Sequence, residues 1–392
     1  MNYDDVLCGR IKNVPPSGIR KFFDIVSEKR DVISLGVGEP DFTTPWRASD
    51  AAIYSLRQGK THYTANRGLK ELCRLVSRYQ QRFKVEYNPD TEIMITVGAS
   101  EGIDLALRAL VEPGDEVLVP DPGYVSYMPC VTFAGGNCVA IPLSAENGFK
   151  LTPELLKKYV TEHTKALVFP YPNNPTGGIM TWEDMLPLAE YLKTTNIVVI
   201  ADEIYAELNY IGNHVSFAAL PGMKERTITL NGFSKAFAMT GWRMGYACAP
   251  KEILDVMLRV HQYTIMCAPT SGQYAAIEAL KSGFETDFEA VKAMVRQYDR
   301  RRRTIVAGLN AAGLKTHEPL GAFYAFPCIK NTQLSSQEFC IKLLSEQKVA
   351  CVPGDAFGNI GEGYVRCSYA ASLDSITEAV RRIGEFAVKY IK

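Results

Sequence analysis

A lysine and an aspartate in this sequence are placed where they could do chemistry together. Lys235 lies in FSKAFAMTGWRMGY, just after a short apolar run, and Asp202 ends the apolar run of IADEIY. An amine among small residues can hold a carbonyl cofactor as a Schiff base, and such a cofactor stabilises a carbanion. A carboxylate at the end of so apolar a strand needs a cationic partner, because burial alone would neutralise it. The ordinary alternatives are a solvated lysine and an aspartate that caps a helix over Glu203–Leu208.

The start of one predicted helix has the features of an anion site. VGASEG follows an apolar run and opens a helical stretch, so the backbone amides of Gly98, Ala99 and Ser100 are free to bind an anion. The helix dipole favours the same charge. Gly98 allows close approach of the backbone, and the hydroxyl of Ser100 can donate. A third polar segment, PNNPTGG at Pro172–Gly178, also follows a strand.

These segments can meet only if the strands that precede them end at the same edge of one sheet. Short β-rich apolar runs alternate with helix-length stretches such as Glu101–Leu110, Pro153–Val160 and Trp182–Leu192. This alternation predicts an α/β fold with a mostly parallel seven-stranded sheet flanked by helices, whose ligands lie beyond the carboxyl ends of the strands. The seven predicted strands are Glu92–Val97, Glu116–Pro120, Cys138–Leu143, Ala166–Pro170, Ile197–Ala201, Thr227–Asn231 and Met244–Cys248.

The end of the chain has a different pattern. Apolar residues from Phe284 to Leu309 recur at helical spacing and predict one long amphipathic helix, with Arg302 on its apolar stripe and paired to a buried acid. Three strands (Phe323–Pro327, Val349–Pro353, Val365–Tyr369) and two helices (near Gln337–Glu346 and Asp374–Val388) are predicted to follow. We expect a large cofactor-binding α/β domain over 45–285 and a smaller α+β domain built from 1–44 with 286–392.

Length and composition set the outer limits. A chain of 392 residues exceeds the size of one hydrophobic core, and 43 basic residues balance 43 acidic ones. The balance argues against a nucleic-acid partner or an anionic membrane surface. No apolar run is long enough to span a membrane, and the first ten residues, MNYDDVLCGR, do not form a secretory signal. Ten scattered cysteines without a C-x-x-C motif, and no H-E-x-x-H, predict no metal site and a cytoplasmic protein.

Four motifs together, in order, resemble the class I/II aminotransferases that use pyridoxal 5'-phosphate on the aspartate-aminotransferase fold. They are VGASEG, PNNPTGG, IADEIY and FSKAFAMTGWRMGY. The resemblance covers nearly the whole chain and implies the pyridoxal-phosphate-dependent transferase fold type I. The implied branch includes aspartate, aromatic and N-acetyl-diaminopimelate aminotransferases, and VHQYTIMCAPTSGQYAAIEAL resembles the last of these as well as any.

The resemblance assigns a role in cofactor binding to each matching residue. It implies that Lys235 forms the Schiff base, that Asp202 pairs with the protonated ring nitrogen, and that Tyr205 and Asn174 hydrogen-bond the phenolic oxygen of the ring. Tyr124 would stack on the ring. The implied phosphate contacts are Gly98, Ala99, Ser100, Ser234 and Arg243, together with Tyr63 from a neighbouring subunit. A shared active site implies an obligate homodimer.

The resemblance also implies which residues bind the substrate. Arg366 in GYVRCSYA matches the arginine that binds the substrate α-carboxylate, and Gly38 and Asn174 match further contacts to it. Arg20 is the one candidate for a distal carboxylate, and a solvated helix residue is its ordinary interpretation. Segments 14–20 and 37–41 are expected to close over the substrate.

The implied reaction is a ping-pong exchange of an amino group between an L-amino acid and a 2-oxo acid such as 2-oxoglutarate. Lys235, Asp202 and Tyr205 are the predicted catalytic residues. A C–S β-lyase or a related elimination enzyme on the same fold would keep these residues and is the alternative. A ligand-sensing regulator is an alternative of another class, but too few residues precede the Ile33–Leu35 strand for a DNA-binding domain. The amino donor, the acceptor and any assembly beyond a dimer are left open.

Overall fold

A twisted sheet of seven strands forms the middle of the chain in the computed structural model, which describes residues 1–16, 18 and 31–391. The strand order is β2-β8-β7-β6-β5-β3-β4, and β8 alone runs antiparallel to its neighbours β2 and β7. The bounds are β2 Ile93–Thr96, β3 Glu116–Asp121, β4 Asn137–Pro142, β5 Thr164–Phe169, β6 Val198–Asp202, β7 Thr227–Gly232 and β8 Gly245–Cys248. The predicted mostly parallel seven-stranded sheet is confirmed.

Helices cover both faces of this sheet, as its continuous apolar strands require. Along β5, Ala166 and Val168 pack with α5 and α6, whereas Leu167 and Phe169 pack with α7 and α8 on the opposite face. The helices of this region are α3 Trp46–Arg57, α4 Lys70–Gln80, α5 Gly98–Leu110, α6 Tyr127–Ala134, α7 Pro153–Tyr159, α8 Trp182–Leu192, α9 Lys251–Thr264 and α10 Thr270–Glu285.

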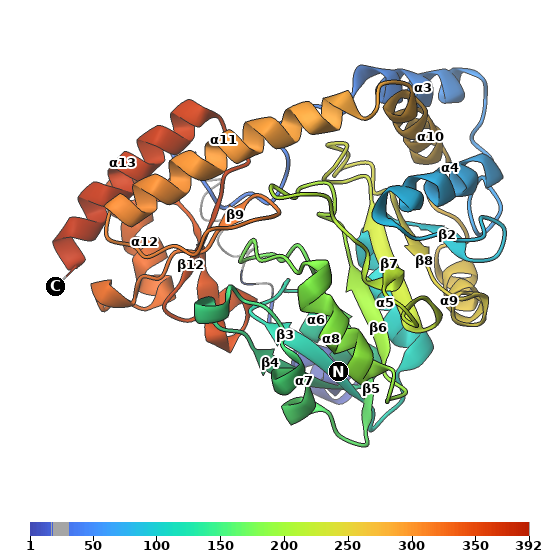
Figure 1. Cartoon of the computed structure of the whole chain (residues 1–392), viewed down its shortest axis with the longest axis horizontal. Coiled ribbons are helices and arrows are strands. Elements are labelled where there is room, and N and C mark those ends of the chain that lie inside the picture. The colour runs from blue at the N-terminus through green and yellow to red at the C-terminus, as the bar shows by residue number, and fades with distance from the viewer. Residues whose placement is uncertain (17, 19–30, 392) are drawn as a thin grey trace.

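A second group of elements lies at the other end of α11 (Glu289–Ala311), next to the carboxyl terminus (Figure 1). It holds a three-stranded antiparallel sheet of β11, β12 and β9, and a parallel pair formed by β1 and β10. The bounds are β1 Ile33–Ser34, β9 Tyr324–Ala325, β10 Val349–Ala350, β11 Val352–Pro353, β12 Val365–Ser368, α12 Ser336–Gln347 and α13 Leu373–Tyr390, with α1 at Gly9–Lys12 near the other terminus. The domain boundaries given above stay a prediction.

Three local expectations are wrong. The predicted helix over 284–309 is interrupted, since Phe284 ends in α10 and the left-handed φ values of Asp287 and Phe288 (48° and 56°) break the helix before α11. Burial of the Phe288 ring against Gly283 keeps the apolar spacing through the break. The predicted strand over 349–353 is divided between two sheets. No helix follows Asp202, because residues 204–207 form a turn.

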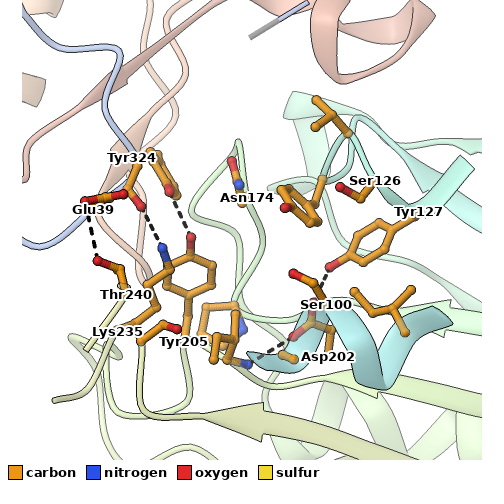
Figure 2. Close-up of a pocket in the computed structure, with 18 of the residues that line it drawn as sticks. Glu39, Ser100, Ser126, Tyr127, Asn174, Asp202, Tyr205, Lys235, Thr240 and Tyr324 are labelled. Carbon is orange, nitrogen blue, oxygen red and sulfur yellow. Dashed lines mark hydrogen bonds between the residues drawn. The ribbon is translucent and has the colours of Figure 1, made fainter. Parts of the chain in front are cut away.

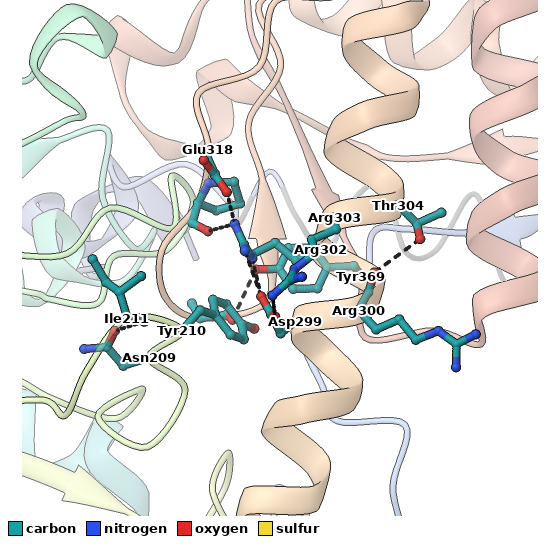
Figure 3. A network of polar contacts seen from close by, with 12 residues as sticks. Asn209, Tyr210, Ile211, Asp299, Arg300, Arg302, Arg303, Thr304, Glu318 and Tyr369 are labelled. Atoms are coloured by element: carbon teal, nitrogen blue, oxygen red, sulfur yellow. Dashed lines mark hydrogen bonds and ion pairs between the residues drawn. The ribbon is translucent and has the colours of Figure 1, made fainter.

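Arg300 and Arg302 project from opposite sides of α11 (Figure 3), so the arginines of the run at 300–303 do not share one face. Arg302 is 6% exposed and forms ion pairs with Asp299 at 2.7 Å and Glu318 at 2.5 Å. Its predicted position on the buried stripe is confirmed, although the side chain of Glu318 is 60% exposed and the carboxylates are not deeply buried. In the described part of the chain, no helix combines the length and hydropathy that a membrane crossing needs.

Candidate active site

The carboxyl ends of β2, β3, β5, β6 and β7 open onto one cavity of about 880 Å³. Most of the residues predicted for the site meet in it, although they come from opposite ends of the chain. Those that line it are Gly38, Ala99, Ser100, Tyr124, Asn174, Asp202, Tyr205, Ser234, Lys235, Arg243 and Arg366. The cavity therefore lies where it was predicted, beyond the carboxyl ends of the strands.

Asp202, the last residue of β6, is buried at 5% exposure and aims its carboxylate into the cavity. The hydroxyl of Tyr127 donates to its Oδ2 at 2.7 Å, and the Ile204 amide donates to Oδ1 at 3.2 Å. Burial raises the pKa of Asp202 to about 6, although the hydrogen bond from Tyr127 lowers it. A cationic ligand in the cavity would favour the ionised carboxylate, so this site suits a protonated ring nitrogen.

Lys235 enters the cavity from the turn after β7. Its Nζ donates to the carbonyl oxygen of Gly38 at 2.6 Å and lies near the ring of Phe323. It also lies near the ring of Tyr205, as Figure 2 shows. Burial lowers the pKa of the Lys235 ammonium to about 8, and the positive charges of Arg366 and Arg243 act in the same direction. A large fraction of the amine is therefore already neutral, and so nucleophilic, at a pH slightly above neutrality.

Tyr205 lies in the turn after Asp202, with its hydroxyl 2.8 Å from the hydroxyl of Tyr324 (Figure 2). Both tyrosines are buried. Burial raises the pKa of Tyr205 well above its ordinary value, so the phenol stays protonated and can act as a hydrogen-bond donor. Tyr124 presents its ring to the same cavity and packs edge to face against Tyr127, with ring centroids 5.5 Å apart.

The amino end of α5 provides the predicted anion site. The helix begins at Gly98, whose φ of 71° is left-handed, and a Cβ at this position would lie 2.7 Å from Nη2 of Arg243. A side chain there would collide with the arginine, which accounts for the glycine. Ala99, Ser100, Ser234 and Arg243 line the cavity at this end, so amides, hydroxyls and a permanent cation are available for a phosphate.

Arg366 on β12 is a buried cation. It is 2% exposed, and none of the described residues forms an ion pair with it. Its Nη1 donates to Oδ1 of Asn174 at 3.0 Å and its Nη2 to the carbonyl oxygen of Gly36 at 2.6 Å, while its Nε is buried without a partner in the described chain. A buried guanidinium held only by neutral acceptors is set to bind an anion.

Three predicted residues lie elsewhere. Gly98 does not line the cavity itself but shapes its edge. Tyr63 is 79% exposed and does not line the cavity of its own chain, so its contact with a neighbouring subunit stays a prediction. Arg20 lies outside the described residues, together with 17 and 19 of the predicted closing segment 14–20.

Two further residues of the site, Tyr127 and Tyr324, were not predicted from the sequence. Tyr127 stands three residues after Tyr124 in DPGYVSY, so its place beyond β3 could have indicated it. Tyr324 lies in GAFYAF, far from any of the four motifs, and its sequence neighbourhood shows only an apolar strand.

Comparisons with known proteins agree with this geometry. Residues 30–383 match the family described as aminotransferase class I and II. An aspartate aminotransferase of Pyrococcus abyssi is 47% identical over 376 residues, covering 95% of this chain and 96% of that protein. An aromatic-amino-acid aminotransferase of Thermococcus litoralis is 45% identical, covering 96% and 97%.

The fold is similar as well. The structure of an aspartate aminotransferase from Thermus thermophilus with maleate superposes with a TM-score of 0.92 at 37% identity, covering 97% of this chain and 99% of that one. The predicted fold type I is thereby confirmed, and with it the enzymatic class. The chain belongs to the class I and II aminotransferases, a family that uses pyridoxal phosphate.

Proposed function

We propose that this enzyme binds pyridoxal 5'-phosphate on Lys235 and moves an amino group between an L-amino acid and a 2-oxo acid. The observation that carries the proposal is the meeting, in one cavity, of a partly neutral lysine, a buried carboxylate and a buried arginine that no described acidic residue pairs with. When bound, the cofactor supplies an aldehyde and an electron-accepting ring. The remaining steps belong to the protein.

Lys235 acts twice in the proposed reaction. Its neutral amine would hold the cofactor, and the same amine, once free, would act first as the base that takes the proton from the substrate α-carbon and then as the acid that gives it back. The pKa near 8 allows both protonation states close to physiological pH. Asp202 would pair with the ring nitrogen and favour its protonated form, and Tyr205 and Asn174 would donate to the phenolic oxygen.

Different residues would bind the cofactor phosphate and the substrate α-carboxylate. Gly98, Ala99, Ser100, Ser234 and Arg243 would hold the phosphate, with the ring lying against Tyr124. The substrate α-carboxylate would bind to Arg366 through two parallel hydrogen bonds, with Asn174 and the Gly38 backbone beside it. Segment 37–41 is then placed to exclude water, because Gly38 already touches Lys235.

We further infer that two copies form a cytoplasmic homodimer in which Tyr63 reaches the phosphate of its partner. Tyr63 is 79% exposed, and Trp46 and Tyr263 are 75% and 87% exposed. An interface between copies would cover large exposed aromatic side chains of this kind, and their exposure supports the proposal in that sense.

The amino donor is the remaining variable. Relatives named for aspartate and for aromatic amino acids match this chain almost equally, at 47% and 45% identity, so the names do not choose between them. We propose 2-oxoglutarate as the acceptor. The decisive experiment is a panel of amino donors with 2-oxoglutarate, in which the visible band of the bound cofactor, glutamate, ammonia and pyruvate are measured.

Glutamate formed without free ammonia supports transamination, whereas pyruvate and ammonia formed without an acceptor indicate the elimination enzyme. Lys235→Ala should abolish the visible band. The matched control is Lys251→Ala, because Lys251 lies on α9 in an exposed ion pair with Asp255 and should not affect the band. A band that survives Lys235→Ala would show that another residue holds the cofactor.

A further inference from the structure

Tyr324 lies at the centre of the site, although none of the roles above falls to it. It belongs to β9, is 1% exposed, and touches elements that are distant in the sequence. We propose that Tyr324 is a positioning residue that donates a hydrogen bond to Tyr205 and so strengthens Tyr205 as a donor to the phenolic oxygen of the cofactor. The inference rests on the proposed function.

The two phenols are arranged for a relay. Their hydroxyl oxygens are 2.8 Å apart, and their rings meet edge to face at 78° with centroids 5.9 Å apart. A phenol has one proton to donate and lone pairs to accept with. If Tyr205 gives its proton to the cofactor oxygen, it must accept from Tyr324, which fixes the order of the pair. Hydrogen bonds in such a chain polarise one another.

The surroundings of Tyr324 hold its hydroxyl in place. The guanidinium of Arg366 lies 4.3 Å from the centre of the Tyr324 ring, and a Cβ on Gly38 would lie 2.7 Å from its hydroxyl oxygen. Burial raises the pKa of Tyr324, and the positive charge of Arg366 opposes that rise and so favours the hydroxyl as a donor. The glycine leaves room for the oxygen. The other titratable groups around the pair are Asp202, Glu39, Tyr124 and Lys235.

This placement distinguishes a relay from simple packing. The Tyr324 ring also contacts Phe323, and a phenylalanine at 324 would keep that contact and the contact with Arg366. Tyr324→Phe therefore removes one oxygen and the relay, and leaves the buried apolar surface almost unchanged. Because a donor to the phenolic oxygen favours its deprotonated form, losing the relay should raise the pH midpoint of the visible spectrum.

The test is a pH titration of the visible band of the holoenzyme and its variants. We expect Tyr324→Phe to raise the midpoint by roughly 0.3 to 1 pH unit, about a two- to ten-fold change in proton affinity, the range of one hydrogen bond. Tyr205→Phe should raise it further, and the double variant should match Tyr205→Phe alone. Tyr298→Phe is the matched control, since Tyr298 is fully buried nearby and its hydroxyl has no partner among the described residues.

Two results of this titration would contradict the relay. An unchanged midpoint in Tyr324→Phe, with or without a changed KM for the amino donor, overturns the relay. A shift of the same size in the Tyr205→Phe background overturns it too, because Tyr324 would then act without Tyr205. Thermal unfolding of the 324 and 298 variants checks that both fold alike. A wild-type protein that develops no visible band with pyridoxal phosphate contradicts the proposed function instead.

Discussion

Replacing Arg366 with leucine should weaken substrate binding while it leaves the free energy of unfolding nearly unchanged. The guanidinium is buried at 2% exposure and makes two hydrogen bonds, to Asn174 and to the Gly36 carbonyl oxygen, but no ion pair with a described residue. In the free protein it therefore carries the desolvation cost of a charge without the compensation of a carboxylate. That cost is what a bound substrate would relieve.

The magnitudes follow from these contacts. Losing two hydrogen bonds from a charged donor costs about 3–6 kcal/mol, and removing an unpaired buried charge returns several kcal/mol, so the two effects largely cancel. We expect the unfolding free energy of Arg366→Leu to stay within about 2 kcal/mol of the wild type. Its affinity for carboxylate substrates should fall by 1.5–3 kcal/mol, roughly 10- to 150-fold.

Arg302→Leu is the matched comparison, because Arg302 is equally buried but paired with two carboxylates and does not line the cavity. It should lose about 1–3 kcal/mol of stability and keep its affinity for substrates. Denaturant unfolding of the cofactor-free proteins and KM values across the donor panel measure both quantities. If Arg366→Leu were destabilised as much as Arg302→Leu and kept its KM for every donor, Arg366 would be a structural residue.

The remaining predictions concern the cofactor end. Because burial lowers the pKa of Lys235 to about 8, the rate at which the cofactor-free protein forms the visible band should rise with pH and level off near 8, not near the ordinary 10.5. Asp202 has a pKa of about 6 against an ordinary 3.8, so between these values the folded protein holds a proton that the unfolded chain releases. The free energy of unfolding of the cofactor-free protein should therefore fall as pH rises through that window, and Asp202→Asn should remove this contribution to the slope. Gly98→Ala should weaken cofactor binding about ten-fold or more by pressing on Arg243, a change measurable by cofactor titration, since losing one charge-assisted contact has that size. Gly114→Ala, at another left-handed glycine with nothing within 4 Å, should cost stability but leave cofactor affinity unchanged.

The apolar runs were sufficient to predict the sheet because most of its strands are buried along most of their length; the edge strand β4 is only partly buried. The largest discrepancy in bounds is at β5, predicted from Ala166 and observed from Thr164. The apolar pattern does not predict strand pairing where every residue of a segment is buried. Residues 349–353 are uniformly buried, yet β10 pairs with β1 and β11 with β12, a choice that depends on where the chain must turn in space.

The same distinction explains which parts of the site could be found from the sequence. Asp202 ends β6 and Lys235 follows the end of β7 closely, so both lie at the edge of the sheet where the parallel strands end. Their positions could therefore be inferred before their contacts were known. Tyr324 lies within a short strand of another sheet, and it reaches Tyr205 across 119 residues of sequence. A buried tyrosine inside a strand looks like any other core residue, and only the hydroxyl pair and the guanidinium over its ring separate it from one. The midpoint of the visible spectrum is therefore the measurement that matters most at this position, since packing alone would not move it.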